Sequence, residues 1–361
     1  MTKRNSRRRL GWKEFLLSLF IMVVVWAAGD VLVLDRGFEG KPEPDASGSV
    51  RVLFTHPRAQ TEDTGATEIH QEFVALIDAA ESSVALAAFD FELTSIASAL
   101  ANAADRGVEV RLVTDSDYAG EAGPRALRAA GIPVVLDDRD ALMHNKFAVI
   151  DGEVVWTGSW NLTQNGTIRN NNNVVVIESA KMARNFTDEF EEMFTDGEFG
   201  ATSPQDIAYP LLDLNGIKVE TFFAPEGNVQ QRIVDLIESA DESVHFMAFV
   251  LTADDISRAL LSQHRAGLRV AGVVESRAVG DPGADFETLR QGGVDIRMDA
   301  NPYLLHHKVI IVDEDTVITG SYNFSASAAE SNDENVVILH SPEVAVPYME
   351  EFESVYASAG E

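Results

Sequence analysis

The chain has 361 residues, of which 45% are hydrophobic and none is cysteine, and its formal net charge is -30. This length and composition are typical of a globular protein with room for two domains, and the lack of cysteine excludes disulfides and thiolate metal sites. An acidic surface repels polyanions at long range, which argues against nucleic-acid binding without excluding it.

The N-terminus has the features of a membrane-targeting segment. Six basic side chains lie within the first fourteen residues, and an apolar run follows over residues 15–34, interrupted at Asp30. About 20 residues are enough to cross a bilayer, and a basic flank is typical of an anchor whose N-terminus stays inside. Because no small-x-small cleavage site precedes Asp30, we favour an uncleaved signal anchor over residues 1–35, followed by a linker over residues 36–50. The rest of the chain would then lie outside the cytoplasm, tethered to the membrane, or would be secreted if the segment is cleaved.

Strands and helices alternate through the first half of the chain. Hydrophobic periodicity predicts strands at residues 50–54, 84–89, 108–113, 134–136, 146–150, 154–157 and 174–177, and helices at 68–80, 95–104, 124–130 and 180–194. Two of the strands are joined at Asp151-Gly152, which is a hairpin signal. The alternation predicts an α/β lobe with helices on both faces of a mixed sheet.

The second half of the chain repeats the first. Residues 83–89 are echoed by 243–249 at an offset of 160, and the pattern H-x-K-x4-D-x6-G-S-x-N occurs twice at an offset of 162. Chance would produce even one copy in well under about one such chain in a thousand. We therefore interpret residues 51–200 and 216–358 as homologous lobes, joined by a linker over residues 201–215.

Each copy of the pattern places an imidazole and an ammonium group on the same side of a strand, because side chains alternate along it. The first copy contains His144, Lys146, Asp151, Ser159 and Asn161, and the second contains His306, Lys308, Asp313, Ser321 and Asn323. If a pseudo-twofold axis brings the two copies face to face, they form a basic pocket rich in hydrogen-bond donors. Such a pocket is suited to a phosphate, whose oxygens lysine, asparagine and serine can hold.

Two histidines in one pocket permit a division of labour. One, neutral, can attack phosphorus, while the other protonates the leaving alcohol and later deprotonates the incoming water. This chemistry needs no metal and no cofactor.

Both copies resemble the HKD motif of the phospholipase D superfamily, and the resemblance covers nearly all of residues 51–358. It implies two homologous α/β/α sandwich lobes with mixed β-sheets, related by pseudo-twofold symmetry, and one active site at their interface. It also implies that His144 is the nucleophile and His306 the acid and base. The residues that it implies for binding phosphate are Lys146, Lys308, Asn161 and Asn323, with Ser159 and Ser321 in support.

One position makes the two halves chemically unequal. Many members of the superfamily have an acidic residue after the motif that hydrogen-bonds an active-site imidazole; Glu334 matches it, whereas Asn172 stands there in the first half. An amide orients an imidazole but does not stabilise an imidazolium as a carboxylate does. Which histidine Glu334 contacts stays open, as does whether Asp151 and Asp313 organise turns or touch substrate.

The resemblance leads us to expect a phospholipase D-type phosphodiesterase that hydrolyses, or transfers to alcohols, the head-group diesters of phospholipids at a membrane surface. A metal-independent endonuclease is one alternative, weakened by the net charge and by the lack of a Lys/Arg cluster outside the N-terminus. A cardiolipin synthase-like phosphatidyltransferase is another, weakened because such proteins usually have two N-terminal hydrophobic segments. No obligate protein partner is implied.

Overall fold

The computed structural model describes residues 41–57 and 67–360. Lys41–Glu361 forms one compact unit. The signal anchor predicted over residues 1–35 lies outside the described residues. Within them, no helix combines the length and the apolar character that crossing a bilayer requires.

The first half of this unit forms a seven-stranded mixed sheet. Its strands are β2 Ser49–Phe54, β3 Ser83–Ala88, β4 Glu109–Thr114, β5 Val134–Leu136, β6 Lys146–Ile150, β7 Val154–Gly158 and β8 Asn173–Glu178. Its helices are α2 Glu68–Ala79, η1 Ser116–Tyr118, α3 Thr94–Asp105, α4 Ala122–Ala129, α5 Gln164–Ile168, α6 Ala180–Glu191 and η2 Glu192–Asp196. The strand order is β2-β8-β7-β6-β3-β4-β5, with β3, β4 and β5 parallel and the other pairs antiparallel.

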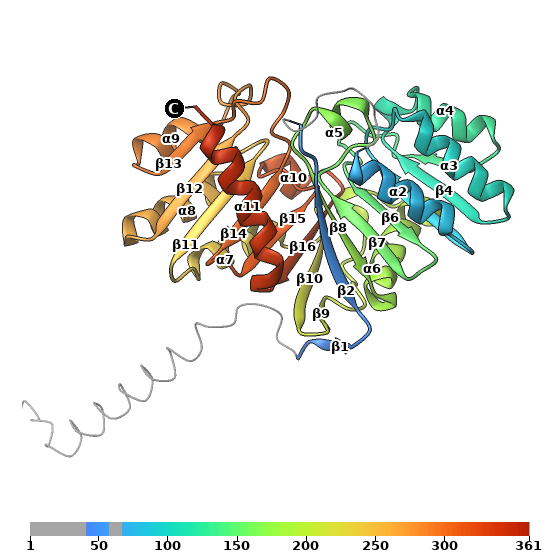
Figure 1. The fold of residues 1–361 in the computed structure, drawn as a ribbon, viewed down its shortest axis with the longest axis horizontal. Coiled ribbons are helices and arrows are strands. Elements are labelled where there is room, and N and C mark those ends of the chain that lie inside the picture. Colours follow the sequence, from blue (N-terminus) through green and yellow to red (C-terminus); the bar gives the residue numbers. More distant parts are fainter. Residues whose placement is uncertain (1–40, 58–66, 361) are drawn as a thin grey trace, which may run out of the picture. The chain divides into compact units, whose positions relative to one another are not determined.

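The second half contains a nine-stranded sheet. Its strands are β1 Glu43–Asp45, β9 Leu211–Leu214, β10 Ile217–Ala224, β11 Ser243–Ala248, β12 Arg269–Val274, β13 Asp295–Met298, β14 Lys308–Val312, β15 Thr316–Gly320 and β16 Glu334–His340. Its helices are η3 Gly200–Thr202, α7 Val229–Glu238, α8 Asp254–Ala266, α9 Phe286–Gln291, α10 Ala326–Glu330 and α11 Pro342–Ser358. Seven of its strands run in the order β10-β16-β15-β14-β11-β12-β13, which repeats the first sheet strand for strand. The predicted pair of mixed α/β lobes is confirmed (Figure 1).

Both linkers that the sequence predicts contain a strand, so these predictions need correction. β1 falls within residues 36–50 and β9 within residues 201–215, and the two pair in parallel at the edge of the second sheet. The strand β1 thus comes before the first lobe in the sequence but belongs to the sheet of the second. The strand β9 pairs with the edge of β10, and β9 in turn offers an edge of backbone groups that the short polar segment of β1 can satisfy.

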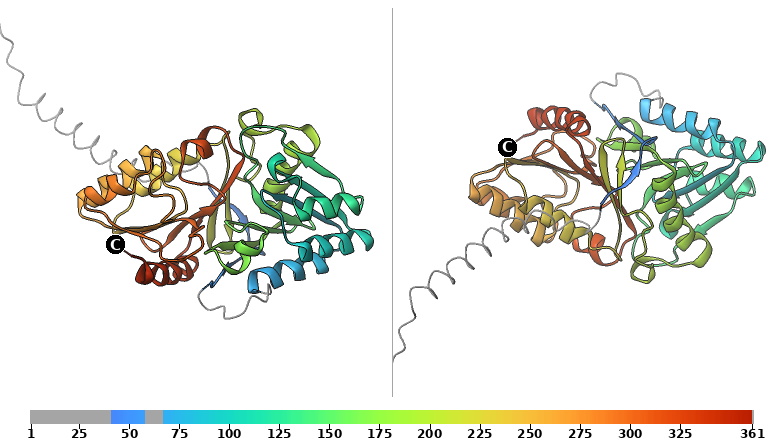
Figure 2. Two further views of the ribbon diagram at one scale, coloured as in Figure 1. Left: turned by 90° about the horizontal axis from the view of Figure 1, so that it is seen from above. Right: turned by 90° about the horizontal axis from the view of Figure 1, so that it is seen from below.

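Apolar side chains form three cores, one on the outer face of each sheet and one shared. Helices α2, α3 and α4 cover the outer face of the first sheet, and α7, α8 and α9 cover that of the second (Figures 1 and 2). The shared core contains residues of both sheets together with α6 and α11. Each lobe therefore has helices on both faces of its sheet, and the two lobes pack against each other through the third core.

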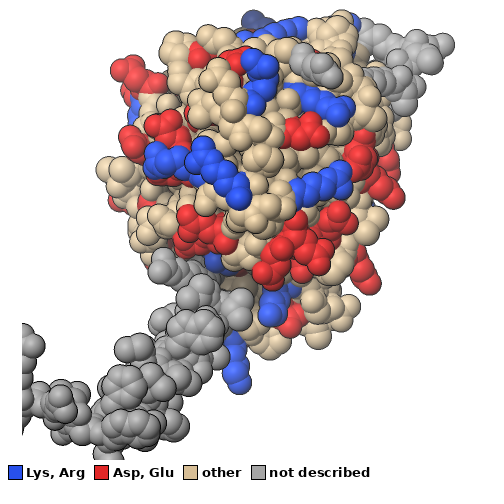
Figure 3. Space-filling model, turned by 90° about the vertical axis from the view of Figure 1, so that its left-hand side faces the viewer, with Lys and Arg blue, Asp and Glu red and all other residues tan. Residues whose placement is uncertain are grey.

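Charges of both signs are interspersed on the face of the second lobe that Figure 3 shows. Arginines of α8, α9, β12 and β13 form ion pairs with neighbouring carboxylates, namely Arg258 with Asp255, Arg269 with Glu353, Arg290 with Glu287 and Arg297 with Asp295. The described residues on this face therefore form no continuous basic patch of the kind that a polyanion would need.

Candidate active site

The two motif histidines lie at the interface between the lobes, each held by the backbone of the opposite lobe. The N–H of His144 donates to the carbonyl oxygen of Asp333, and the N–H of His306 donates to that of Asn171, both at 2.9 Å. Burial lowers the pKa of His306, and the neighbouring Lys308, Lys146 and His144 lower it further. The structure thus brings together the two halves of the predicted site.

Buried amide–hydroxyl hydrogen bonds fasten the lobes beside the histidines. Asn335 donates to the Thr157 hydroxyl at 2.5 Å, and Asn173 donates to that of Thr319 at 2.7 Å. Asn335 also accepts from the backbone N–H of Lys146 at 3.1 Å. Because each of these side chains is buried, replacing one would leave a polar group without its partner, so the contacts specify how the lobes dock.

In the first lobe an aromatic ring packs against both motif side chains. The Phe89 ring lies 4.7 Å from the His144 ring, and the Lys146 ammonium lies 4.9 Å from the Phe89 ring centroid. The Lys146 Nζ also donates to the carbonyl oxygen of His144 at 2.9 Å. The side chains of residues 144 and 146 therefore project from β6 to the same side, as the alternation predicts.

The second lobe repeats this arrangement. Phe249 lies 4.8 Å from the His306 ring and 4.8 Å from the Lys308 ammonium, whose Nζ donates to the His306 carbonyl oxygen at 3.0 Å. The distances between phenylalanine and histidine rings, and between lysine ammonium groups and phenylalanine rings, agree to within about 0.1 Å between the lobes. The pseudo-twofold symmetry therefore applies to these side chains as well as to the backbone.

The two lysines are buried next to each other, which is costly without an anion between them. Burial lowers the pKa of Lys146 to about 7, although Glu334, Asp90 and Asp115 raise it. Burial and the charge of Lys146 lower the pKa of Lys308 well below its ordinary value. A phosphate bound between the lysines would stabilise both charges, so the site favours an anionic ligand.

The structure answers the question that the sequence leaves open, because Glu334 contacts His144 across the interface. The Glu334 carboxylate accepts from the Ser321 hydroxyl at 2.6 Å, and the same oxygen lies 2.7 Å from the Nδ1 of His144. Since that oxygen acts as an acceptor, the ring donates through Nδ1–H and its Nε2 is left for substrate. Burial raises the pKa of Glu334 to about 8, with Lys146 opposing it. A positive charge on the neighbouring His144 ring would lower this pKa again and favour the carboxylate form.

His306 is oriented in the same way by an amide. The Nδ1 of His306 lies 2.9 Å from the Oδ1 of Asn172, which also accepts from the Ser159 hydroxyl at 2.9 Å. The Asn172 Nδ2 donates to the Gly166 carbonyl, which turns its oxygen towards the ring. His306 therefore carries its proton on Nδ1, and its Nε2 also faces away from the supporting shell.

Both imidazoles have a depressed pKa. Burial lowers the pKa of His144 and of His306 well below the ordinary value, and the positive charges of Lys146 and Lys308 lower each further. Without a ligand, both rings are thus neutral at pH 7. A bound phosphate anion acts in the opposite direction and favours protonation of one of them.

The glycine and asparagine of each motif complete the site. A Cβ at Gly158 would collide with the carbonyl oxygen of Asn173, and Gly320 meets Asn335 in the same way, so the tight strand packing requires glycine. Asn161 and Asn323 lie three residues after these glycines. Among the described residues the buried Oδ1 atoms of their side chains have no hydrogen-bond partner, so each amide oxygen could accept a hydrogen bond from a donor on a ligand.

The match to known proteins agrees with this geometry. Residues 73–194 and 233–356 match the family described as "Cardiolipin synthase, PLD-like domain". The chain belongs to this family. Phospholipase D of Rickettsia prowazekii (strain Madrid E) is 30% identical over 161 residues, which cover 45% of this chain and 78% of that protein. The mitochondrial cardiolipin hydrolase of Xenopus tropicalis is 38% identical over 117 residues, which cover 32% of this chain and 56% of that protein.

A solved structure supports the fold of both PLD-like lobes together. The crystal structure of phosphatidylserine synthase from Haemophilus influenzae Rd KW20 aligns with a TM-score of 0.65 at 14% identity. The alignment covers 86% of this chain and 87% of that chain.

The aspartates of the two PLD-like motifs bind backbone and lie away from the histidines. Asp151 accepts from the backbone N–H groups of Glu81, Ser82 and Ser83 at 2.7–3.2 Å. Asp313 likewise accepts from the backbone N–H groups of residues 241–243 at 2.7–2.9 Å. The sequence left open whether these aspartates organise turns or touch substrate. The structure shows them in the first role, because they bind the backbone that leads into β3 and β11.

Several supporting residues of the PLD-like site escape the motif search. Asp115 accepts from the N–H of Met143 at 3.0 Å, and Glu275 accepts from that of Leu305 at 2.7 Å, so each fixes the residue before a motif histidine. Both acids end equivalent strands at an offset of 160, and that repetition is the signal that could have revealed them.

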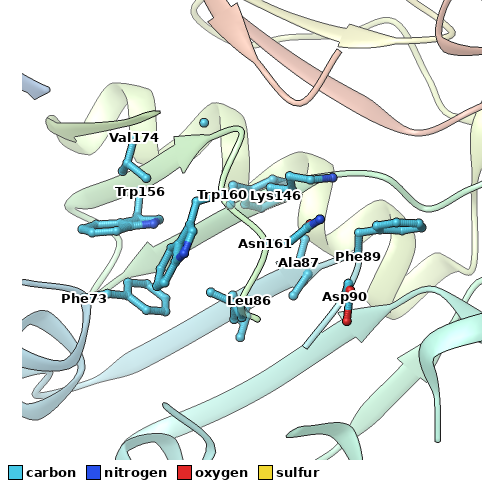
Figure 4. A pocket seen from close by; sticks show the side chains of 14 residues that line it. Phe73, Leu86, Ala87, Phe89, Asp90, Lys146, Trp156, Trp160, Asn161 and Val174 are labelled. Carbon is cyan, nitrogen blue, oxygen red and sulfur yellow. The ribbon is translucent and has the colours of Figure 1, made fainter. Parts of the chain in front are cut away.

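A pocket in the first lobe reaches two of the side chains that the sequence predicts to bind phosphate, Lys146 and Asn161. Its lining includes Phe89, Asp90, Lys146, Trp160 and Asn161, and Figure 4 shows these residues gathered at the ends of their strands. The apolar deeper wall is part of the outer core of the first lobe. The polar mouth is the part that a substrate bound to the PLD-like site would meet.

Proposed function

We propose that the chain is a phospholipase D-type phosphodiesterase that hydrolyses the head-group diester of a phospholipid. The observation that carries this proposal is the meeting of two complete motifs, with two buried lysines and two oriented imidazoles, at one interface. The relatives named phospholipase D and mitochondrial cardiolipin hydrolase support a lipid as substrate.

In the first step the Nε2 of His144 attacks phosphorus. The bond between phosphorus and the head-group oxygen breaks, and His306, protonated once the phosphate is bound, gives its proton to that oxygen. The free alcohol leaves, and the phosphatidyl group remains on His144 as a phosphohistidine. Lys146, Lys308, Asn161 and Asn323 hold the non-bridging oxygens, with the hydroxyls of Ser159 and Ser321 keeping the supporting residues in place.

In the second step water replaces the histidine. His306, now neutral, accepts a proton from the water as its oxygen attacks phosphorus, and the bond to the His144 nitrogen breaks. The products are phosphatidic acid and the regenerated enzyme. An alcohol in place of water would give transfer in place of hydrolysis.

The unequal partners of the two imidazoles support this assignment of roles. Phosphorylation of His144 places positive charge on its ring, and the Glu334 carboxylate next to Nδ1 stabilises that charge. His306 faces the neutral amide of Asn172, so its imidazolium is less stabilised and is the stronger acid.

We also propose that residues 1–35 anchor the protein in a membrane with the lobes outside the cytoplasm, where a phospholipid head group is within reach. The basic flank and apolar run support this location. Cleavage of the segment would instead release the lobes as a secreted enzyme.

The test is an assay of the purified full chain, with a chelator present, on phosphatidylcholine, phosphatidylglycerol, cardiolipin and single-stranded DNA. We expect release of phosphatidic acid from a lipid, and a phosphorylated protein that can be trapped by acid quench with labelled substrate. His144→Ala should abolish both signals, whereas His264→Ala, a matched change on α8, should leave them intact. Cleavage of DNA with no turnover of any lipid would contradict the proposal.

A further inference from the structure

Several side chains around the two motif lysines are duplicated in the two lobes, but a carboxylate near Lys146 is not. Phe89 and Phe249 end the equivalent strands β3 and β11 and contact their lysines alike. The next residue is Asp90 in the first lobe and Val250 in the second. The carboxylate of Asp90 is therefore not a feature that the fold requires in both lobes.

The Asp90 side chain is half-buried at the mouth of the pocket that Lys146 and Asn161 also line (Figure 4). Among the described residues, no hydrogen bond or ion pair is made by its carboxylate. Burial raises the pKa of Asp90 to about 6, and the nearby Glu121 and Glu92 raise it further, whereas Lys146 lowers it. Asp90 is thus a partly desolvated negative charge whose acidic neighbours outnumber its one basic neighbour.

Aromatic rings stand beside this carboxylate. Phe89 packs against Tyr118 with 4.5 Å between ring centroids, and the negative charge of Asp90 contributes to raising the pKa of Tyr118. In the second lobe Ala278 takes the place of Tyr118, and it lines an apolar pocket together with Phe249. A carboxylate next to aromatic faces is the environment that binds an ammonium group.

We propose that Asp90 selects substrates whose head group carries a positive charge, so that the substrate class is a phosphodiester of an amine-bearing alcohol. The inference rests on the proposed phosphodiesterase function. The ammonium group lies against Asp90 and the rings of Phe89 and Tyr118 while the neighbouring phosphate lies on Lys146 and Asn161. The bound cation also offsets the repulsion between Asp90 and the acidic side chains of Glu92 and Glu121.

The experiment compares kcat/KM of the full chain for phosphatidylethanolamine and phosphatidylglycerol with identical acyl chains in the same mixed micelles. We expect the unmodified protein to prefer phosphatidylethanolamine. Asp90→Asn should lower kcat/KM for this lipid about tenfold and leave that for phosphatidylglycerol within about twofold. Asp90→Val, which introduces the residue found at the equivalent position 250, should change the two kcat/KM values in the same way. Asp90→Glu should keep the preference for phosphatidylethanolamine.

Asp105→Asn is the matched control, since it removes the same charge from an exposed position at the end of α3. It should leave the ratio of the two lipids unchanged. Turnover of phosphatidylglycerol shows that each variant is folded and active. An unchanged lipid ratio in Asp90→Asn, or an equal loss on both lipids, overturns the role of Asp90 alone. An unmodified protein that cleaves neither lipid overturns this inference, and one that also fails to cleave phosphatidylcholine and cardiolipin overturns the proposed function with it.

Discussion

At the residue scale, the proposed chemistry depends on one pair of unlike residues at equivalent places in the two lobes. Glu334 and Asn172 occupy equivalent places, each bound to a motif serine and to the histidine of the opposite lobe. A carboxylate stabilises a positively charged ring, whereas an amide only orients a neutral one. In the proposed mechanism, the pair therefore distinguishes the histidine that becomes phosphorylated from the one that exchanges protons.

We expect Glu334→Gln to lower kcat by about a hundredfold or more, because the charge that forms on His144 loses its partner. Asn172→Ala should cost less, since it removes orientation but no charge, and Asn172→Asp should raise the pKa of His306 and weaken it as an acid. Single-turnover kinetics would separate formation of the phosphohistidine from its hydrolysis. A larger loss of phosphorylation rate from Asn172→Ala than from Glu334→Gln would mean that the two histidines exchange roles.

At the element scale, the hairpins that follow the motif strands explain why each pattern contains an aspartate. Asp151 has a positive φ of 55° and Asp313 one of 51°, a conformation that aspartate and asparagine tolerate better than most residues. Their carboxylates accept backbone hydrogen bonds from the segments that lead into β3 and β11. These contacts tie each motif hairpin to the strand that pairs with its first strand, β3 beside β6 and β11 beside β14.

Asp151→Ala should therefore reduce the free energy of unfolding by about 1–3 kcal/mol, because backbone donors lose their acceptor. The kcat should stay within a few-fold of the unmodified protein at temperatures where the variant is folded. Urea denaturation would measure the free energy of unfolding, and an assay of lipid turnover would measure kcat. As a control, Asp78→Ala on the exposed face of α2 should change the free energy of unfolding by no more than about 0.5 kcal/mol. Loss of turnover with unchanged stability would instead place Asp151 at the substrate.

At the scale of the whole molecule, the shared core makes the two lobes one folding unit. Phe186 of α6 packs against Phe147 of the first lobe at 5.1 Å and against Phe223 of the second at 5.2 Å, as ring centroids. The same core contains Phe352 of α11. Since neither lobe can open without exposing this apolar surface, we expect them to unfold together.

Equilibrium denaturation of the full chain should then show one transition by three probes: far-UV circular dichroism, fluorescence of Trp156 and Trp160 in the first lobe, and lipid turnover. Phe223→Ala should shift all three together, with a loss of about 3–5 kcal/mol for a buried phenylalanine. If the fluorescence transition of the first lobe kept its midpoint while turnover was lost earlier, the lobes would be independent.

Much of the fold and the composition of the site follow from the sequence. Alternating apolar residues predict the motif strands: β6 begins and ends at the predicted residues, and β7 extends one residue further. The duplicated motif predicts two matching lobes, and the strand orders agree with this. The strand β1 and the short helix α5 escape prediction because their segments, EPD and QNGTI, contain almost no apolar residues from which a period could be recognised. The strand β9 escapes as well.

The sequence by itself determined which side chains the site contains, since strand alternation and a repeated spacing are local properties that a linear pattern records. The tertiary structure alone decided how they are connected: Glu334 serves a histidine 190 residues away, and Asn172 serves one 134 residues away. It also placed Asp90 in one pocket with Lys146 and Asn161. These contacts depend on how two sheets dock through a common core and through buried amide–hydroxyl pairs, and no local pattern specifies that packing.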